Sequence, residues 1–312
     1  MGAVHDLLLL RGEAVARAQA DGDRRAVEAA IRFMSDDDLE TAFVFSGWAQ
    51  AALPHKRLLD NAPWQLRTDH MTLLVEPGRR VVPSGPPVDV GVPYGSRARL
   101  ILIYLQTEAL RTGKREVELG GSLREWLGRM GIAAGGKSIK DVREQAERLA
   151  RCRISFHVIR GNHVGLVNQN IVEDTLFLSE HSGDGQGSLF AETATLSDAF
   201  YKQLQRHPVP VQEAAIRAIS NNSMALDLYV WLAYRLHSLS APKPISWRAL
   251  HAQLGASFAR IDNFRQTFKE NLNLALAVYP EATVDVETEG LVLRPSRPPV
   301  APRLIQGSKL PR

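Results

Sequence analysis

The sequence predicts an α+β fold with two winged-helix domains in tandem and a helical extension in front of them. Two observations support this prediction. Residues 122–131 match residues 246–255, with Ser, Arg and Gly at the same places, and residues 96–105 match residues 223–232. A further helical pattern and then two short alternating runs joined by a glycine turn follow each copy. The repeat is too long for a solenoid, so it indicates two domains of one kind.

We assign residues 1–58 to the helical extension. Apolar residues recur at helical spacing over residues 4–35, and Asp21-Gly22-Asp23 divides this segment into two helices. The apolar run at residues 7–10 is too short to cross a membrane and lacks the basic flank of a signal peptide. The single cysteine, Cys152, fits a reducing compartment. We therefore expect a cytoplasmic protein that binds no membrane.

We assign residues 59–182 to the first winged-helix domain. Residues 70–75 alternate as in a strand, and Pro and Gly are dense over residues 82–93, as in a linker or an extended arm. An apolar helix is then predicted, followed by a short strand, a helix capped by Ser122, a glycine turn and a second helix. These elements cover residues 96–112, 116–119, 122–130 and 138–151, with a hairpin over 154–167 and a strand at 175–178.

We assign residues 183–296 to the second domain, because a Gly/Ser/Asp-rich loop at 181–188 marks a boundary. Its predicted helices cover residues 196–205, 211–219, 222–239, 246–254 and 261–278, and its hairpin covers 283–293. Residues 297–312 are basic and rich in proline, so we expect a disordered tail. A helix-turn-helix followed by a hairpin is the winged-helix arrangement, in which the second helix enters a major groove of DNA.

The second helix of each copy has an apolar face and a polar face. In the second copy Ile261, Phe264, Phe268 and Leu272 are predicted to point inward, which leaves amide and guanidinium groups outward. Such groups pair with adenine and guanine in the major groove. We therefore predict base readout by Arg260, Asn263, Arg265, Gln266 and Lys269.

The first copy carries more lysine at the start of its helix, which suits contacts with the DNA backbone. The residues predicted for these contacts are Lys137, Ser138, Lys140, Arg143 and Arg148, with Arg160 and His163 in the hairpin turn. The turn of the second hairpin carries Glu287 and Glu289, which phosphate would repel, so the two hairpins should differ. The competing interpretation is that these polar residues form the solvated faces of amphipathic helices.

Residues 131–138 also satisfy the P-loop pattern, in which Lys137 would reach phosphates and Ser138 would hold magnesium. That motif needs a buried strand before it, whereas the preceding segment has a helical pattern. The histidines lack the spacing of a metal site, and no partner group surrounds a candidate nucleophile such as Tyr201. We therefore predict no cofactor, no metal and no enzymatic activity, and nucleotide binding is kept as the less favoured alternative.

Several strings resemble the plasmid-encoded RepA replication initiators of Gram-negative bacteria. They lie at residues 91–99, at the Gly-Gly-Lys-Ser turn with 142–146, at 220–223, at 229–237, and at 245–247 with 250–251. The resemblance covers roughly residues 60–300. It implies binding to repeated double-stranded sites at a plasmid origin, and therefore association with nucleoid or plasmid DNA. It also implies recruitment of the host initiator and replicative helicase, a homodimer, and repression of its own gene. A winged-helix repressor with no role in replication is the main alternative.

Overall fold

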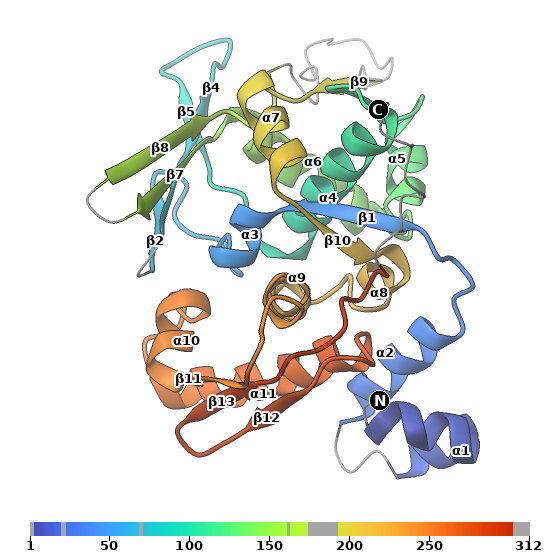
Figure 1. The fold of residues 1–312 in the computed structure, drawn as a ribbon. Coiled ribbons are helices and arrows are strands. Elements are labelled where there is room, and N and C mark those ends of the chain that lie inside the picture. Colours follow the sequence, from blue (N-terminus) through green and yellow to red (C-terminus); the bar gives the residue numbers. More distant parts are fainter. Residues whose placement is uncertain (1–2, 20–22, 69–70, 161–162, 174–192, 302–312) are drawn as a thin grey trace, which may run out of the picture.

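The computed structural model describes residues 3–19, 23–68, 71–160, 163–173 and 193–301, with the backbone alone at 158–160 and 163–169. Two units that share one order of elements lie one above the other (Figure 1). In each unit a long apolar helix is followed by a short strand, two helices and a two-stranded hairpin. This order is that of a winged-helix fold, as the repeat predicts.

The first unit consists of α4 (Gly95–Thr112), β6 (Glu116–Glu118), α5 (Leu123–Arg129), α6 (Gly136–Arg151), β7 (Arg153–Arg160) and β8 (His163–Gln169). Helix α4 ends at Gly113, whose φ of 71° places it in the left-handed region that glycine adopts without strain. Helix α5 begins at Ser122, whose side chain accepts a hydrogen bond from the Glu125 amide.

The second unit consists of α9 (Ser223–Leu236), β11 (Lys243–Ser246), α10 (Trp247–Leu254), α11 (Ile261–Ala277), β12 (Val284–Val286) and β13 (Gly290–Leu293). Asn222 and Ser246 cap α9 and α10 by accepting hydrogen bonds from backbone amides. The three strands pair in the order β11-β13-β12. The starts of α9 and α10 therefore follow local capping residues that are visible in the sequence, whereas α11 begins without a side-chain cap.

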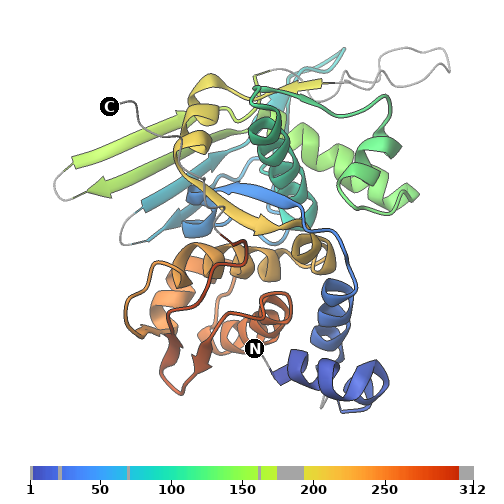
Figure 2. The same ribbon diagram turned by 45° about the vertical axis from the view of Figure 1, so that its right-hand side comes forward.

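The sheets of the two units differ. In the first unit, the β7–β8 hairpin joins β2 (Trp64–Arg67) and β3 (Met71–Glu76) in a four-stranded antiparallel sheet with the order β2-β3-β7-β8. Strand β6 pairs with β9 (Thr193–Thr195) instead of with this hairpin. Figure 2 shows this sheet on one side of the first unit and α5 and α6 on the other. The alternating burial of β3 explains why its pattern is recognisable in the sequence.

The N-terminal segment is only partly helical. Helices α1 (Ala3–Ala18) and α2 (Arg24–Met34) are present as predicted, and α2 packs against α11 and α8 (Glu213–Ala218). They are followed by β1 (Thr41–Phe45) and α3 (Ser46–Gln50). Strand β1 pairs with β10 (Pro208–Gln212), so the expectation of a purely helical extension is wrong, because a strand distant in sequence completes this ribbon.

Three further expectations need correction. The helix predicted over residues 211–219 begins only at α8, since Val209 and Val211 face the core from β10. The segment predicted as a linker or an extended arm contains β5 (Val88–Gly91), which pairs with β4 (Gly78–Arg80), so it is an arm with strand structure and not a linker. At the start of the tail, the Arg297 carbonyl accepts a hydrogen bond from the Tyr279 hydroxyl at 2.7 Å, so this part is ordered. The predicted strand at 175–178 lies outside the described residues, as do residues 302–312.

One continuous hydrophobic core runs through both units. Helices α4 and α9 pack against each other at its centre, and α7 (Asp198–Arg206) also contacts α4. Tyr229 and Trp231 of α9 lie in this core and are 0% and 1% exposed. The shared core fixes the position of α6 relative to α11.

Candidate nucleic-acid interface

The first turns of α6 present cations to solvent. Gly135 precedes the helix and provides no side-chain cap. Lys137 and Lys140 are exposed, whereas Ser138 and Arg143 are half-buried. The opposite face carries Val142, Ala146 and Leu149, which are at most 1% exposed. Unpaired amides and lysine side chains at a helix N-terminus favour anions such as phosphate. This end of α6 can therefore contact a DNA backbone.

The prediction for Arg148 is wrong, because its side chain points into the protein. It is only 3% exposed. Its guanidinium forms ion pairs with Glu144 at 2.9 Å and Asp60 at 3.1 Å, and donates to the Val92 carbonyl. It also lies over the Tyr94 ring, 5.2 Å from the centroid. Arg148 therefore anchors α6 to the loop before α4, and we exclude it from the candidate interface. This role is not evident from the sequence, because Asp60 is distant in sequence from Arg148.

The exposed face of α11 carries the residues predicted to contact bases. Arg260, Asn263 and Gln266 are exposed, while Phe264, Phe268 and Leu272 are completely buried. The Arg260 guanidinium is 3.9 Å from the Asp262 carboxylate, and both side chains are mostly exposed. An ion pair that is this exposed is weak, so it does not hold the guanidinium in place. The Gln266 side-chain amide donates to the Glu270 carboxylate at 3.5 Å, also on the exposed surface. Both contacts are solvated, so these side chains can exchange them for hydrogen bonds with base edges.

Trp247, at the start of α10, supports the cations of α11. The Arg265 guanidinium and the Lys269 amine each lie 5.7 Å from the centroid of its ring. The indole Nε1 donates to the Thr288 carbonyl at 3.1 Å, in the turn between β12 and β13. Trp247 therefore connects the outward helix with the hairpin. This role is not evident from the sequence, although Trp247 stands where the first copy has Leu123.

The two hairpins carry different groups at their turns. Glu287 and Glu289 are exposed in the turn between β12 and β13, as the prediction of unequal hairpins requires. Arg160 and His163 face each other in the β7–β8 register, but their side chains lie outside the described residues.

Cys152 is 1% exposed, and burial raises the pKa of its thiol to about 12, in keeping with a structural role.

The P-loop interpretation of residues 131–138 lacks its structural context. Helix α5, and no strand, precedes Gly131, whose φ of 66° forms the turn between α5 and α6. The buried strand that positions a phosphate-binding loop is therefore missing at this place. The glycines serve the turn of the helix-turn-helix.

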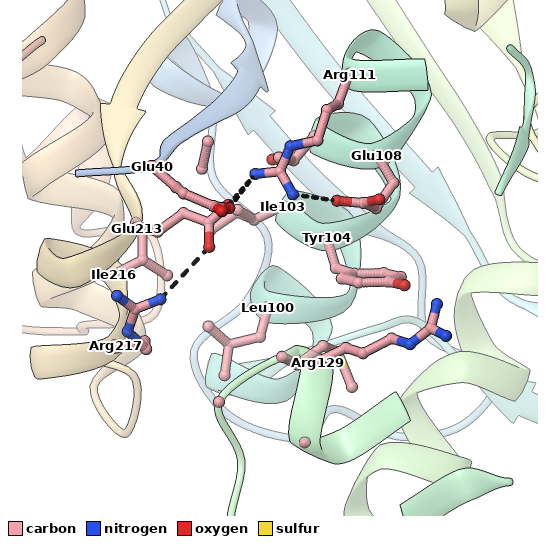
Figure 3. Close-up of a pocket in the computed structure, with 15 residues that line it drawn as sticks. Glu40, Leu100, Ile103, Tyr104, Glu108, Arg111, Arg129, Glu213, Ile216 and Arg217 are labelled. Atoms are coloured by element: carbon pink, nitrogen blue, oxygen red, sulfur yellow. Dashed lines mark hydrogen bonds and ion pairs between the residues drawn. The ribbon is translucent and has the colours of Figure 1, made fainter. Parts of the chain in front are cut away.

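A pocket between α4, α5 and α8 contains many charged groups (Figure 3). The Arg111 guanidinium forms ion pairs of 2.6–2.8 Å with Glu40, Glu108 and Glu213. Arg217 binds Glu213 and two further carboxylates, Asp36 and Asp38. Carboxylates of Asp38, Glu40 and Glu213 approach within 4.8 Å, but these arginines neutralise them. The pocket is an ion-pair network that connects the N-terminal segment to α4 and α8.

Comparison with known proteins identifies the family. A model of the plasmid-encoded RepA protein family matches residues 92–248, half of the chain. This protein belongs to the RepA family of plasmid replication initiators. The match covers the first unit and the second unit as far as the start of α10, so it does not reach α11. The resemblance noted in the sequence is thereby confirmed.

A solved structure of RctB has a similar fold. The crystal structure of a selenomethionine derivative of domains 2 and 3 of RctB aligns with 80% of this chain and 98% of its own, at 12% identity and a TM-score of 0.52. A second RctB structure, spanning domains 2–3, aligns at 12% identity with a TM-score of 0.47. A search of curated protein sequences gives no match. Within the described residues of this RepA-family chain, none of the helices is both long and apolar enough to span a bilayer.

Proposed function

We propose that this protein starts plasmid replication by binding repeated double-stranded DNA sites at the origin through α6 and α11. Two units in one chain can occupy successive major grooves on one face of the duplex. The observation that carries the proposal is the exposed stripe of Arg260, Asn263 and Gln266 along α11, whose opposite face is packed in the core. Membership of the RepA family supports the role in replication.

The two units have different tasks in this proposal. Helix α11 selects bases, and Lys137 and Lys140 on α6 bind the backbone. The bound protein then recruits the host initiator and replicative helicase and represses its own gene, and it acts without catalysis, cofactor or metal. A homodimer is the form that we assign to repression.

The experiment uses a minimal replicon that carries the gene and its flanking DNA repeats. Persistence of this plasmid with the intact gene and its loss with Arg260→Ala and Asn263→Ala together support an initiator. Binding to the repeats without any replication would instead indicate a repressor. Absence of binding to duplex DNA at moderate salt would refute the proposal.

A further inference from the structure

A second basic surface lies between the two units, and the proposed function does not use it. This interunit cleft has a volume of about 580 Å³. Gln50, Arg67 and Thr68 line it from α3 and β2, and Arg235, Lys243 and Arg248 line it from the second unit. The Gln253 side chain donates to the Gln50 carbonyl at 3.3 Å across the units, which holds the two walls together.

The charge of the interunit cleft is uncompensated. No carboxylate is among the described residues that line it, and its four cations form no ion pair with the described part of the chain. The pocket of Figure 3 is the opposite case, because Arg111 and Arg217 are each surrounded by carboxylates. Solvated surface arginines are common, but four cations that converge from two units on one concave surface create a strong local potential for anions.

Two further features favour an anionic ligand there. The Nε atom of Arg235 is buried and has no hydrogen-bond partner among the described residues. The buried Nε cannot itself reach a ligand, so Arg235 contributes the positive charge of its guanidinium to the cleft. The N-terminal turn of α10, with its Ser246 cap, also opens into the cleft, which adds the positive end of a helix dipole.

We propose that the interunit cleft binds a phosphate ester and that its source is the DNA backbone between the two major-groove contacts. The proposal rests on the proposed function, since it extends the DNA contact of α6 and α11 to a third place. A phosphate held at once by Arg67 from one unit and Arg248 from the other bridges the units. The cleft therefore fixes the protein on the duplex without contributing to base recognition.

The test combines Arg67→Gln with Arg248→Gln, because both side chains are exposed and their loss leaves the core intact. Lys114→Gln is the matched control, since Lys114 is exposed, lies in the turn after α4 and pairs with no described carboxylate. We expect the double variant to bind an origin fragment about tenfold more weakly, with site preference unchanged. The slope of log K against log salt should fall by about 1 for each cation removed.

Phosphate ethylation interference locates the contact. With the unaltered protein, ethylation should interfere at phosphates between the two protected major-groove segments, and the double variant should lose interference at those positions alone. An unchanged footprint and salt slope in the double variant would overturn this proposal, while the proposed function would stand. If the unaltered protein binds no origin DNA, the proposed function itself fails.

Titration with ATP distinguishes a free phosphate ester from the DNA backbone. Weak or no binding of ATP, together with the loss of central phosphate contacts in the double variant, supports DNA as the source. Tight ATP binding that the double variant abolishes, with its DNA affinity intact, would overturn the assignment to DNA.

Discussion

Arg99 of α4 and Asp227 of α9 form a two-point ion pair that joins the two units inside the core. Arg99 Nε and Nη2 donate to the two carboxylate oxygens at 2.8 and 2.7 Å. The same guanidinium donates to the carbonyls of Leu53, Pro54 and Gly95. Arg99 and Asp227 are 6% and 9% exposed, so every bond is shielded from water.

Asp227→Asn should destabilise the protein by about 3–5 kcal/mol, because it leaves the Arg99 guanidinium buried without a counter-charge. The measurement is the free energy of unfolding in urea. The control is Asp89→Asn, which removes the exposed ion pair with Arg79 and should cost less than about 1 kcal/mol. Equal effects of the two substitutions would contradict a structural role for the buried pair.

Asn263→Ala should lower the preference for the cognate site by about 1–3 kcal/mol, because one base contact from α11 is lost. Lys140→Ala should weaken binding to all sequences alike and reduce the salt slope by about 1. Competition shift assays with cognate and scrambled duplexes measure both effects. If site preference survives Asn263→Ala, α11 is not the base-contacting helix.

Trp247→Phe should weaken DNA binding, although it retains an aromatic ring. It removes the hydrogen bond to the Thr288 carbonyl, a loss of about 0.5–1.5 kcal/mol in stability, and it offers a weaker surface to Arg265 and Lys269. Thermal unfolding and DNA titration follow the two consequences separately. Trp48→Phe is the control, because Trp48 is also in the core, packs edge-on against Phe156, and has no cation at its ring in the described structure. The prediction fails if both variants bind DNA equally well.

Stability should fall as the pH drops from about 6.5 toward 4, because burial and the neighbouring Arg99 lower the pKa of His55 to about 4. Asp227 opposes this shift but does not outweigh it. The native state keeps the ring neutral, whereas the unfolded chain takes up a proton below about 6.5. The contribution of the neutral His55 ring to the free energy of unfolding is therefore complete above pH 6.5. It declines as the pH falls from 6.5 toward 4, by up to about 3 kcal/mol.

Urea unfolding at a series of pH values tests the role of His55. His55→Asn preserves a polar atom near the Ser223 hydroxyl, which lies 3.0 Å from His55 Nδ1. The variant should show a flatter pH profile between 4 and 6.5. A profile identical to that of the unaltered protein would assign the acid sensitivity to other groups.

Much of the fold was predictable because it follows local patterns. Ser122 and Ser246 signal helix starts directly, and the inward positions of α11 follow a 3.6-residue period that the structure confirms. The ribbon of β1 and β10 was not predictable, since its partners are distant in sequence and Pro208 and Pro210 weaken any strand pattern.

For the candidate interface, the sequence predicts which side chains of α11 are exposed but does not predict contacts between distant segments. The exposure of Arg260 and Asn263 follows from periodicity alone. The burial of Arg148 does not, because it depends on Asp60 and Tyr94, which only the folded chain brings to that side of α6. The support of Arg265 by Trp247 likewise requires the crossing of two helices.

The contact between the N-terminal helices and α11 has a practical consequence. The His5 ring donates to the Ala277 carbonyl at 2.9 Å, at the end of α11, and α2 covers part of the inner surface of the same helix. A shortened chain that starts at Thr41 would expose that surface of α11 to water. It would also leave the Ala277 carbonyl without its hydrogen bond from His5. We expect such a chain to aggregate, and a loss of DNA binding in it would say nothing about whether residues 1–40 contact the origin.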